Sequence, residues 1–175
     1  EISMLASFGK LFVPVHRRVR VAVLSTGDEL LEPGEPLEPG KIVNSNSLAL
    51  AAAVVQAGAV PVMLGIARDN KESLREKLAE GLKADVLITS AGVSAGDRDY
   101  VRDVLDELQV RQVFWKVDIK PGRPTAFALR DGKPVFSLPG NPVSSLLTFE
   151  EFVRPALLKM MGHRRVLRPL ITATL

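Results

Sequence analysis

Compact hydrophobic runs alternate along the chain with longer stretches that carry helix signals. Three of these runs, at 19–25, 60–67 and 85–90, are rich in Val, Leu and Ile. Short apolar runs of this kind are typical of strands that are buried on both faces of a sheet. We therefore predict three buried strands at these positions.

The segments between the runs predict helices. Residues 44–58 begin with Asn and Ser, which are good helix caps, continue as an apolar body and end at a glycine. In 70–84, leucine recurs every four residues, which gives one apolar face. A third helix is predicted over 98–108. Strand and helix thus alternate three times.

The second half of the chain predicts three more strands and a closing helix. We expect the strands at 110–119, 124–130 and 134–138, with an Arg-Asp-Gly-Lys turn between the last two. The helix covers 141–162 and has Pro142 in its first turn, where proline is tolerated.

This order predicts an α/β fold of three layers, α/β/α, around a mostly parallel sheet. The pattern covers 19–165, which we expect to be one domain. Residues 1–18 and 166–175 lack the pattern, and we expect them to belong to neighbouring regions of a longer protein. In such sheets, ligands bind at the carboxyl ends of the strands, so the residues after each strand matter most.

Composition excludes several functional classes. The chain has 175 residues, a net charge of +3 with interleaved signs, one Trp and one Tyr. This argues against a nucleic-acid groove, which needs clustered cations or aromatic platforms. The absence of cysteine excludes disulfides and thiolate chemistry. No apolar run could span a membrane, and we expect a cytoplasmic protein.

Charged residues follow the predicted strands in two groups. Carboxylates follow the first three strands, and cations follow the fourth; these residues are Asp28, Glu29, Asp69, Asp97, Asp99, Lys116, Lys120 and Arg123. Clustered carboxylates suit Mg²⁺, whereas cations and the helix start at 139–145 suit an oxyanion. The sequence therefore predicts a site for a metal-bound, phosphorylated, anionic substrate.

Each of these features also has a purely structural interpretation. Asp69, Asp97 and Asp99 could cap the helices that follow them, and Lys116 could be a solvated strand residue. The Lys-Pro-Gly-Arg-Pro and Pro-Gly-Asn-Pro segments could be ordinary turns. It is their joint placement at successive strand ends that favours a functional site.

Taken as a set, six motifs identify a family. The segments STGDEL, NSNS, GIARDN, AGVSAGDRDY, KPGRP and LPGNPVSS, in this order, resemble the molybdopterin molybdenumtransferases of the MoeA type, which include the E domain of gephyrin. The resemblance covers about 19–162. It implies the central, MogA-like domain, with 1–18 as the tail of the preceding region and 166–175 as the start of a β-rich domain.

The family resemblance also implies an activity. Family members insert molybdate into adenylylated molybdopterin and release AMP in a Mg²⁺-dependent step, and they are homodimers. Two other functions stay open: adenylyl transfer to molybdopterin, as in MogA-like proteins, and a non-catalytic binding or scaffold role.

The resemblance assigns roles to individual residues of this chain. It implies catalytic roles for Glu29, Asp69, Asp99, Lys116 and Lys120, and metal binding by Asp69, Asp97 and Asp99. The implied substrate-binding residues are Asp28, Gly92, Ser94, Gly96, Arg123, Pro124, Pro139, Gly140, Asn141, Pro142 and Ser144.

Three positions depart from the family pattern. Arg123 stands where lysine is common, Ala91 replaces glycine, and Asn70 replaces a second aspartate. The last change leaves Asp69 as the only carboxylate in its motif.

Overall fold

A computed structural model of the chain describes residues 1–91 and 100–172. Its centre is a six-stranded sheet. From one edge to the other, the strands are β4 (Val60–Ala67), β1 (Arg20–Thr26), β5 (Val86–Ser90), β8 (Lys133–Leu138), β7 (Ala126–Arg130) and β6 (Arg111–Phe114). The three buried strands predicted from the hydrophobic runs are confirmed as β1, β4 and β5. The predicted strand over 110–119 is shorter than expected, and Lys116 follows it.

The sheet is mostly parallel, and strand order reverses next to β1. Strands β4, β1, β5 and β8 are parallel, while β7 runs antiparallel to both of its neighbours. The chain passes from β1 to β4 on one side and then returns to β5 on the other side. The carboxyl ends of β1 and β5 therefore form the switch point at which such sheets bind ligands.

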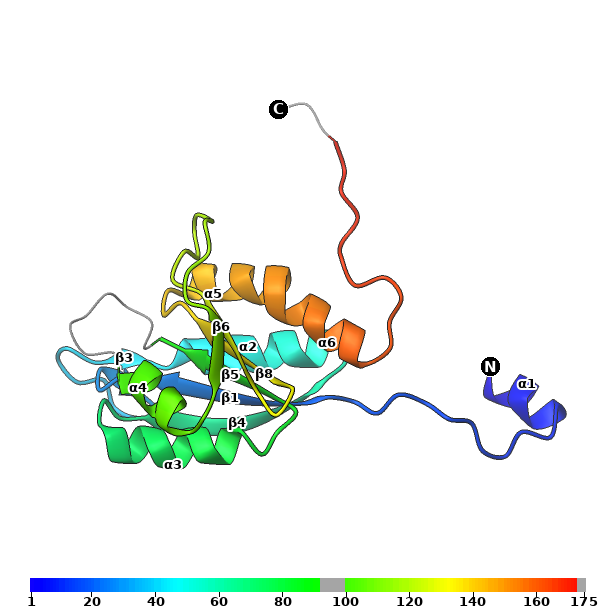
Figure 1. The fold of residues 1–175 in the computed structure, drawn as a ribbon, viewed down its shortest axis with the longest axis horizontal. Helices are drawn as coiled ribbons and strands as arrows, with labels where there is room; N and C mark the ends of the chain where they lie inside the picture. The colour runs from blue at the N-terminus through cyan, green and yellow to red at the C-terminus, as the bar shows by residue number, and fades with distance from the viewer. Residues whose placement is uncertain (92–99, 173–175) are drawn as a thin grey trace.

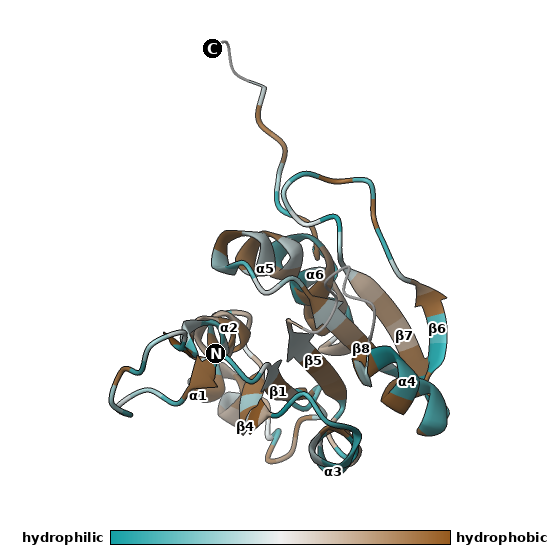
Figure 2. Ribbon diagram, turned by 90° about the vertical axis from the view of Figure 1, so that its left-hand side faces the viewer, coloured by the Kyte–Doolittle hydropathy of each residue, from teal (hydrophilic) through white to brown (hydrophobic). Residues whose placement is uncertain are grey.

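Helices cover both faces of the sheet, which confirms the three-layer α/β/α prediction (Figures 1 and 2). One face carries α2 (Ser45–Gln56), α5 (Pro142–Thr148), a π-helical turn η1 (Phe149–Val153) and α6 (Arg154–Met160). The other face carries α3 (Lys71–Gly81) and α4 (Tyr100–Glu107). Side chains of β1 alternate between two cores, so Val23 packs beneath α2 and Leu24 packs towards α3.

Asparagine begins three of these helices. The side chains of Asn44, Asn70 and Asn141 each accept a hydrogen bond from the backbone N–H three residues later. The predicted turn before β8 is also present, with positive φ at Asp131 and Gly132, as a two-residue hairpin requires.

The closing helix, predicted as continuous over 141–162, is interrupted. The π-helical turn η1 separates α5 from α6, and Pro155 is the second residue of α6. Proline has no N–H and its ring crowds the carbonyl one turn earlier, so a wider turn at this point relieves both problems. The sequence prediction overlooked Pro155.

Both ends of the chain lie outside the sheet and its helices (Figure 1). Helix α1 (Ile2–Ser7) has no buried residue, and residues 163–172 lie along or away from the body. Arg17 holds the first segment to the body through Asp85, at 2.5 and 2.6 Å. Within the described ranges, no helix has the length and hydrophobicity needed to cross a membrane.

Candidate functional site

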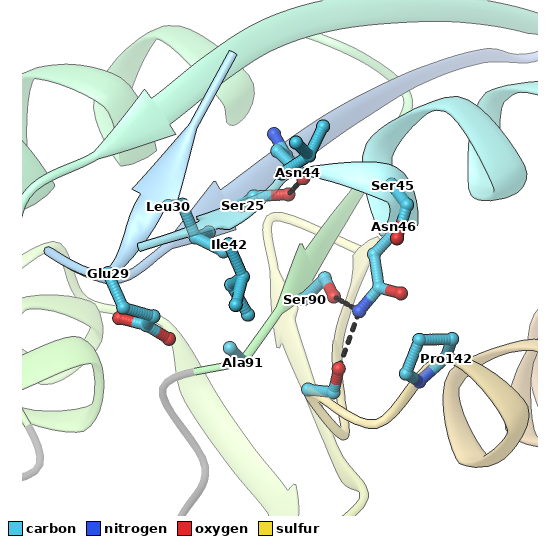
Figure 3. A pocket seen from close by; sticks show the side chains of 12 residues that line it. Ser25, Glu29, Leu30, Ile42, Asn44, Ser45, Asn46, Ser90, Ala91 and Pro142 are labelled. Atoms are coloured by element: carbon cyan, nitrogen blue, oxygen red, sulfur yellow. Dashed lines mark hydrogen bonds between the residues drawn. The ribbon is translucent and has the colours of Figure 1, made fainter. Parts of the chain in front are cut away.

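A cavity of about 290 Å³ opens at the switch point of the sheet (Figure 3). It lies at the ends of β1, β5 and β8, against the start of α2 and the short strands β2 (Leu30–Leu31) and β3 (Ile42–Val43). Its described lining consists of Ser25, Glu29, Leu30, Ile42, Val43, Asn44, Ser45, Asn46, Ser90, Ala91, Gly140 and Pro142.

Asn46 joins three walls of this cavity. Its Nδ2 donates to the hydroxyl oxygen of Ser90 at 2.9 Å and to the carbonyl oxygen of Gly140 at 2.7 Å (Figure 3). Ala91, directly after β5, has φ of 71°, and its N–H donates to the carbonyl of Leu138. The start of α2 thus fixes the segments that leave β5 and β8.

A second asparagine holds the end of β1. The Oδ1 of Asn44 accepts hydrogen bonds from the hydroxyl of Ser25 at 2.8 Å and from the backbone N–H of Ser47 at 3.3 Å. Ser25 and Asn44 are both almost fully buried. Two asparagines at one helix start therefore position two neighbouring strand ends.

Glu29 is the one charged side chain among the described residues that line the cavity. Its carboxylate lies against Gly27, at a place that any Cβ on Gly27 would occupy. Gly27 has φ of 144°, a conformation that side chains with a Cβ rarely adopt, so the backbone favours glycine here, whereas the Glu29 side chain could move aside.

Asp28 and Asp69 form a reciprocal pair beside the cavity. The backbone N–H of Asp69 donates to Oδ1 of Asp28 at 3.1 Å, and the N–H of Asp28 donates to Oδ2 of Asp69 at 3.3 Å. Asp69 is not the cap of α3, because Asn70 performs that role. Asn70, which stands where the family has a second aspartate, is therefore a helix cap, and asparagine and aspartate cap helices about equally well.

Two cations stabilise the backbone of the acidic half of the site. Lys41 donates to the carbonyl of Asp28 at 2.7 Å, and Arg68 donates to the carbonyl of Leu30 at 3.0 Å. Both signs of charge therefore occur at the end of the site where the sequence predicted carboxylates.

The predicted basic loop lies on the opposite flank of the sheet. Lys116, Lys120 and Arg123 are exposed between β6 and β7, and the loop extends beyond α5 (Figure 1). Gly122 packs so closely against α5 that a Cβ would lie 2.6 Å from Thr148. The acidic pair follows β1 and β4 and the loop joins β6 to β7, so about four strand spacings, roughly 19 Å, separate them across the sheet.

The structure brings some predicted site residues together and separates others. Glu29, Gly140 and Pro142 line the cavity, while Pro139, Asn141 and Ser144 lie in or beside the start of α5. Arg123 and Pro124 belong to the distant basic loop. Five predicted residues lie outside the described part of the chain: Gly92, Ser94, Gly96, Asp97 and Asp99.

The predicted metal set cannot be compared in full with the structure, because Asp97 and Asp99 fall outside the described residues. Within 1–91 and 100–172, no three acidic, histidine or cysteine side chains form a group that could hold a metal ion. Asp28 and Asp69 form a pair of carboxylates that come from different strand ends.

Most of the described residues that line the cavity were not among the predicted site residues. Those that form hydrogen bonds at the strand ends are Ser25, Asn44, Asn46 and Ser90. The NSNS segment was a usable signal, since it precedes a helix that follows the first buried strand. It was interpreted as a set of helix caps and as a family motif, but no site role was given to its side chains, two of which bind neighbouring strand ends.

Comparisons with known proteins agree with this architecture. A family model described as "Probable molybdopterin binding domain" matches residues 22–159. A molybdopterin molybdenumtransferase from Nostoc sp. is 44% identical over 166 residues, which are 93% of this chain and 38% of the relative. The chain thus spans about two fifths of that relative's length.

Solved structures give the same result. The molybdopterin biosynthesis protein MoeA from Pyrococcus horikoshii superposes with a TM-score of 0.82 at 37% identity, over 93% of this chain and 40% of that protein. The MoaB enzyme from Thermus thermophilus shares the fold, with a TM-score of 0.61 at 18% identity over 82% and 97% of the two chains. The chain therefore belongs to the family of probable molybdopterin binding domains.

Proposed function

We propose that this chain is the central substrate-binding domain of a molybdopterin molybdenumtransferase, which inserts molybdate into adenylylated molybdopterin and releases AMP. The family match and the name of the Nostoc relative support this proposal. Because the chain covers only part of that relative, other domains and a second subunit would complete the enzyme. We expect the full protein to be a cytoplasmic homodimer.

One structural observation carries the proposal. The acidic pair, the cavity and the basic loop follow one another in this order across the carboxyl ends of the strands, over roughly 19 Å. A substrate with a ring, a pyrophosphate and a nucleoside is long enough to contact several of these places. Held at fixed points, the two substrates would react as if they were one molecule.

The acidic pair fits a divalent cation. Asp28 and Asp69 are exposed, and each accepts a backbone hydrogen bond with one carboxylate oxygen, which leaves further lone pairs. Mg²⁺ is commonly held by one or two carboxylates, waters and substrate phosphate. When bound, Mg²⁺ would neutralise charge on the pyrophosphate. We propose that Asp97 and Asp99 add to this set.

The basic loop would hold an oxyanion. Lys116, Lys120 and Arg123 are exposed on one loop, and Gly122 keeps that loop against α5. Arginine presents a planar pair of donors where lysine presents a point charge, so Arg123 could bind two oxygens of one molybdate. We propose that this loop binds molybdate.

The test is a titration of the chain with adenylylated molybdopterin, with and without Mg²⁺, followed by pterin fluorescence. Trp115 gives a second signal, since it is the single tryptophan and lies next to Lys116. Asp69→Asn and Lys120→Ala should each weaken Mg²⁺-dependent binding, while Lys83→Ala, at the opposite end of the sheet, should not. Equal binding by all three variants would contradict the proposed site.

A further inference from the structure

Two serines end neighbouring strands at the floor of the cavity. Ser25 of β1 and Ser90 of β5 are partners in the parallel register, and each is 1% exposed. Both line the cavity, and each is hydrogen-bonded to an asparagine at the start of α2 (Figure 3). The two hydrogen bonds have opposite directions, and this direction decides what each serine offers to a ligand.

Ser25 uses its proton within the protein. The Oδ1 of Asn44 accepts the backbone N–H of Ser47, and because an N–H can only donate, this atom must be the amide oxygen. Ser25 therefore donates its hydroxyl proton to Asn44. Its oxygen lone pairs are left for the cavity, so Ser25 is an acceptor there.

Ser90 has the opposite polarity. The Nδ2 of Asn46 faces the carbonyl of Gly140, and because a carbonyl can only accept, this atom must be the amide nitrogen. Ser90 therefore accepts from Asn46. Within the described part of the chain, no hydrogen bond from the Ser90 hydroxyl occurs, so its proton is available and Ser90 is a donor.

The rest of the lining favours a neutral ligand. Apart from Glu29, the described lining residues are uncharged, and none of them is a lysine or arginine. A bare oxyanion would therefore find a carboxylate and no cation. Leu30, Ile42 and Pro142 add apolar surface suited to a flat ring. A volume of about 290 Å³ is at the small end for ligand pockets, which is enough for one ring system.

We propose that this cavity binds the lactam edge of a neutral planar heterocycle, with Ser90 donating to the ring C=O and Ser25 accepting from the adjacent N–H. Asn46 and Asn44 act as positioning residues that set the two polarities. This proposal rests on the proposed function. It assigns the cavity to the pterin ring of the substrate and places the ring apart from the anion-binding loop.

The test uses two small probes and three matched serine variants. Pterin (2-amino-4-oxopteridine) presents N–H beside C=O, whereas 2,4-diaminopteridine presents the inverted order, an acceptor nitrogen beside an amine. Fluorescence titration should give weaker binding of the inverted probe. Ser25→Ala and Ser90→Ala should each weaken pterin binding roughly three- to tenfold, the effect of one neutral hydrogen bond.

The control is Ser145→Ala. Ser145 is also 1% exposed, its hydroxyl has no partner, and it does not contribute to the described lining. Its replacement should leave pterin binding unchanged. Asn46→Asp tests the direction of the hydrogen bond. The introduced carboxylate can only accept, so the Ser90 hydroxyl would donate to it and not to the ligand, and pterin affinity should fall as in Ser90→Ala.

The outcomes separate this inference from the proposed function. Failure of the chain to bind pterin, or equal binding by the Ser25, Ser90 and Ser145 variants, overturns the inference even if adenylylated molybdopterin binds with Mg²⁺. Pterin binding that depends on Ser25 and Ser90, without Mg²⁺-dependent binding of adenylylated molybdopterin, supports the inference and contradicts the proposed function.

Discussion

Asp28 and Asp69 each accept a hydrogen bond from the backbone N–H of the other, which links the ends of β1 and β4. Neither carboxylate caps a helix, because Asn70 caps α3. The reciprocal bonds hold two negative groups beside each other, and within 1–91 and 100–172 neither carboxylate forms an ion pair with a cation. Such an arrangement is the one that a divalent cation would stabilise.

We expect Asp69→Asn to reduce the affinity for Mg²⁺ by at least about tenfold, or ~1.4 kcal/mol, because one ligand charge is lost. The amide oxygen can still accept from the N–H of Asp28, so thermal stability should change little. The measurement is the Mg²⁺ concentration that gives half-maximal substrate binding. Glu35→Gln, in the exposed loop after β2, is the matched control; an equal loss in both variants would mean that only net charge matters.

Lys120→Ala should raise the molybdate concentration required for the reaction by roughly tenfold, ~1.4 kcal/mol, because an exposed cation is removed from the proposed oxyanion loop. Folding should not change, since Lys120 is exposed. Steady-state kinetics of the full-length enzyme at varied molybdate, with Lys83→Ala as control, measure this. An unchanged molybdate dependence would assign the loop another role.

The ion pair of Arg17 and Asp85 should make stability depend on acid pH. Hydrogen bonds from Arg17, and then from the backbone N–H of Arg20, lower the pKa of Asp85 from 3.8 to about 2. A lowered carboxyl pKa adds stability that is fully present above about pH 4 and is lost as the pH falls through 2.

Asp85→Asn should therefore lower the free energy of unfolding at pH 7 by about 1–2 kcal/mol. The loss should not exceed this range, because Arg17 is exposed and solvent screens its charge. Denaturant unfolding at several pH values tests this, and the difference from the parent chain should shrink towards pH 2. Asp131→Asn, whose side chain is 86% exposed, should have no such effect. A difference that is constant with pH would mean that the loss comes from packing.

Ala91→Gly should stabilise the chain slightly. Ala91 has φ of 71°, a conformation that costs a residue with a Cβ about 1–2 kcal/mol. Glycine avoids this cost, but its greater freedom in the unfolded chain offsets about 0.5–1 kcal/mol of the stabilisation. A net gain of roughly 0.5 kcal/mol corresponds to ~1–2 °C in Tm, which calorimetry can detect. Ala53→Gly, inside α2, should instead lower Tm; a lower Tm in both variants would contradict the strain at Ala91.

Most of the fold could be predicted from the sequence because its signals are local. Hydrophobic runs of five to eight residues, asparagine caps and the Asp131–Gly132 turn each depend on neighbouring residues. The two errors have different origins. The strand before Lys116 ends earlier than its apolar pattern predicts. Pro155 divides the closing helix because proline has no N–H, a local signal that the prediction overlooked.

Less of the candidate site could be predicted. Glu29, Gly140 and Pro142 were expected there and do line the cavity, since all follow strand ends. Asn46 was not expected at the site, because its partners Ser90 and Gly140 are 44 and 94 residues away in the chain. A contact at such a separation leaves no periodic signal in a single sequence.

The sequence by itself determined the order of elements, the α/β class and the edge of the sheet at which ligands bind, because periodicity and strand-end residues are properties of short segments. Only the tertiary structure decided which of those residues meet. It brought Ser25 and Ser90 side by side in register, joined Asp28 to Asp69, and placed Lys120 on the far flank of the sheet. The physical reason is that strand order is fixed by how the crossovers pack, so neighbours along the edge are not neighbours in the sequence.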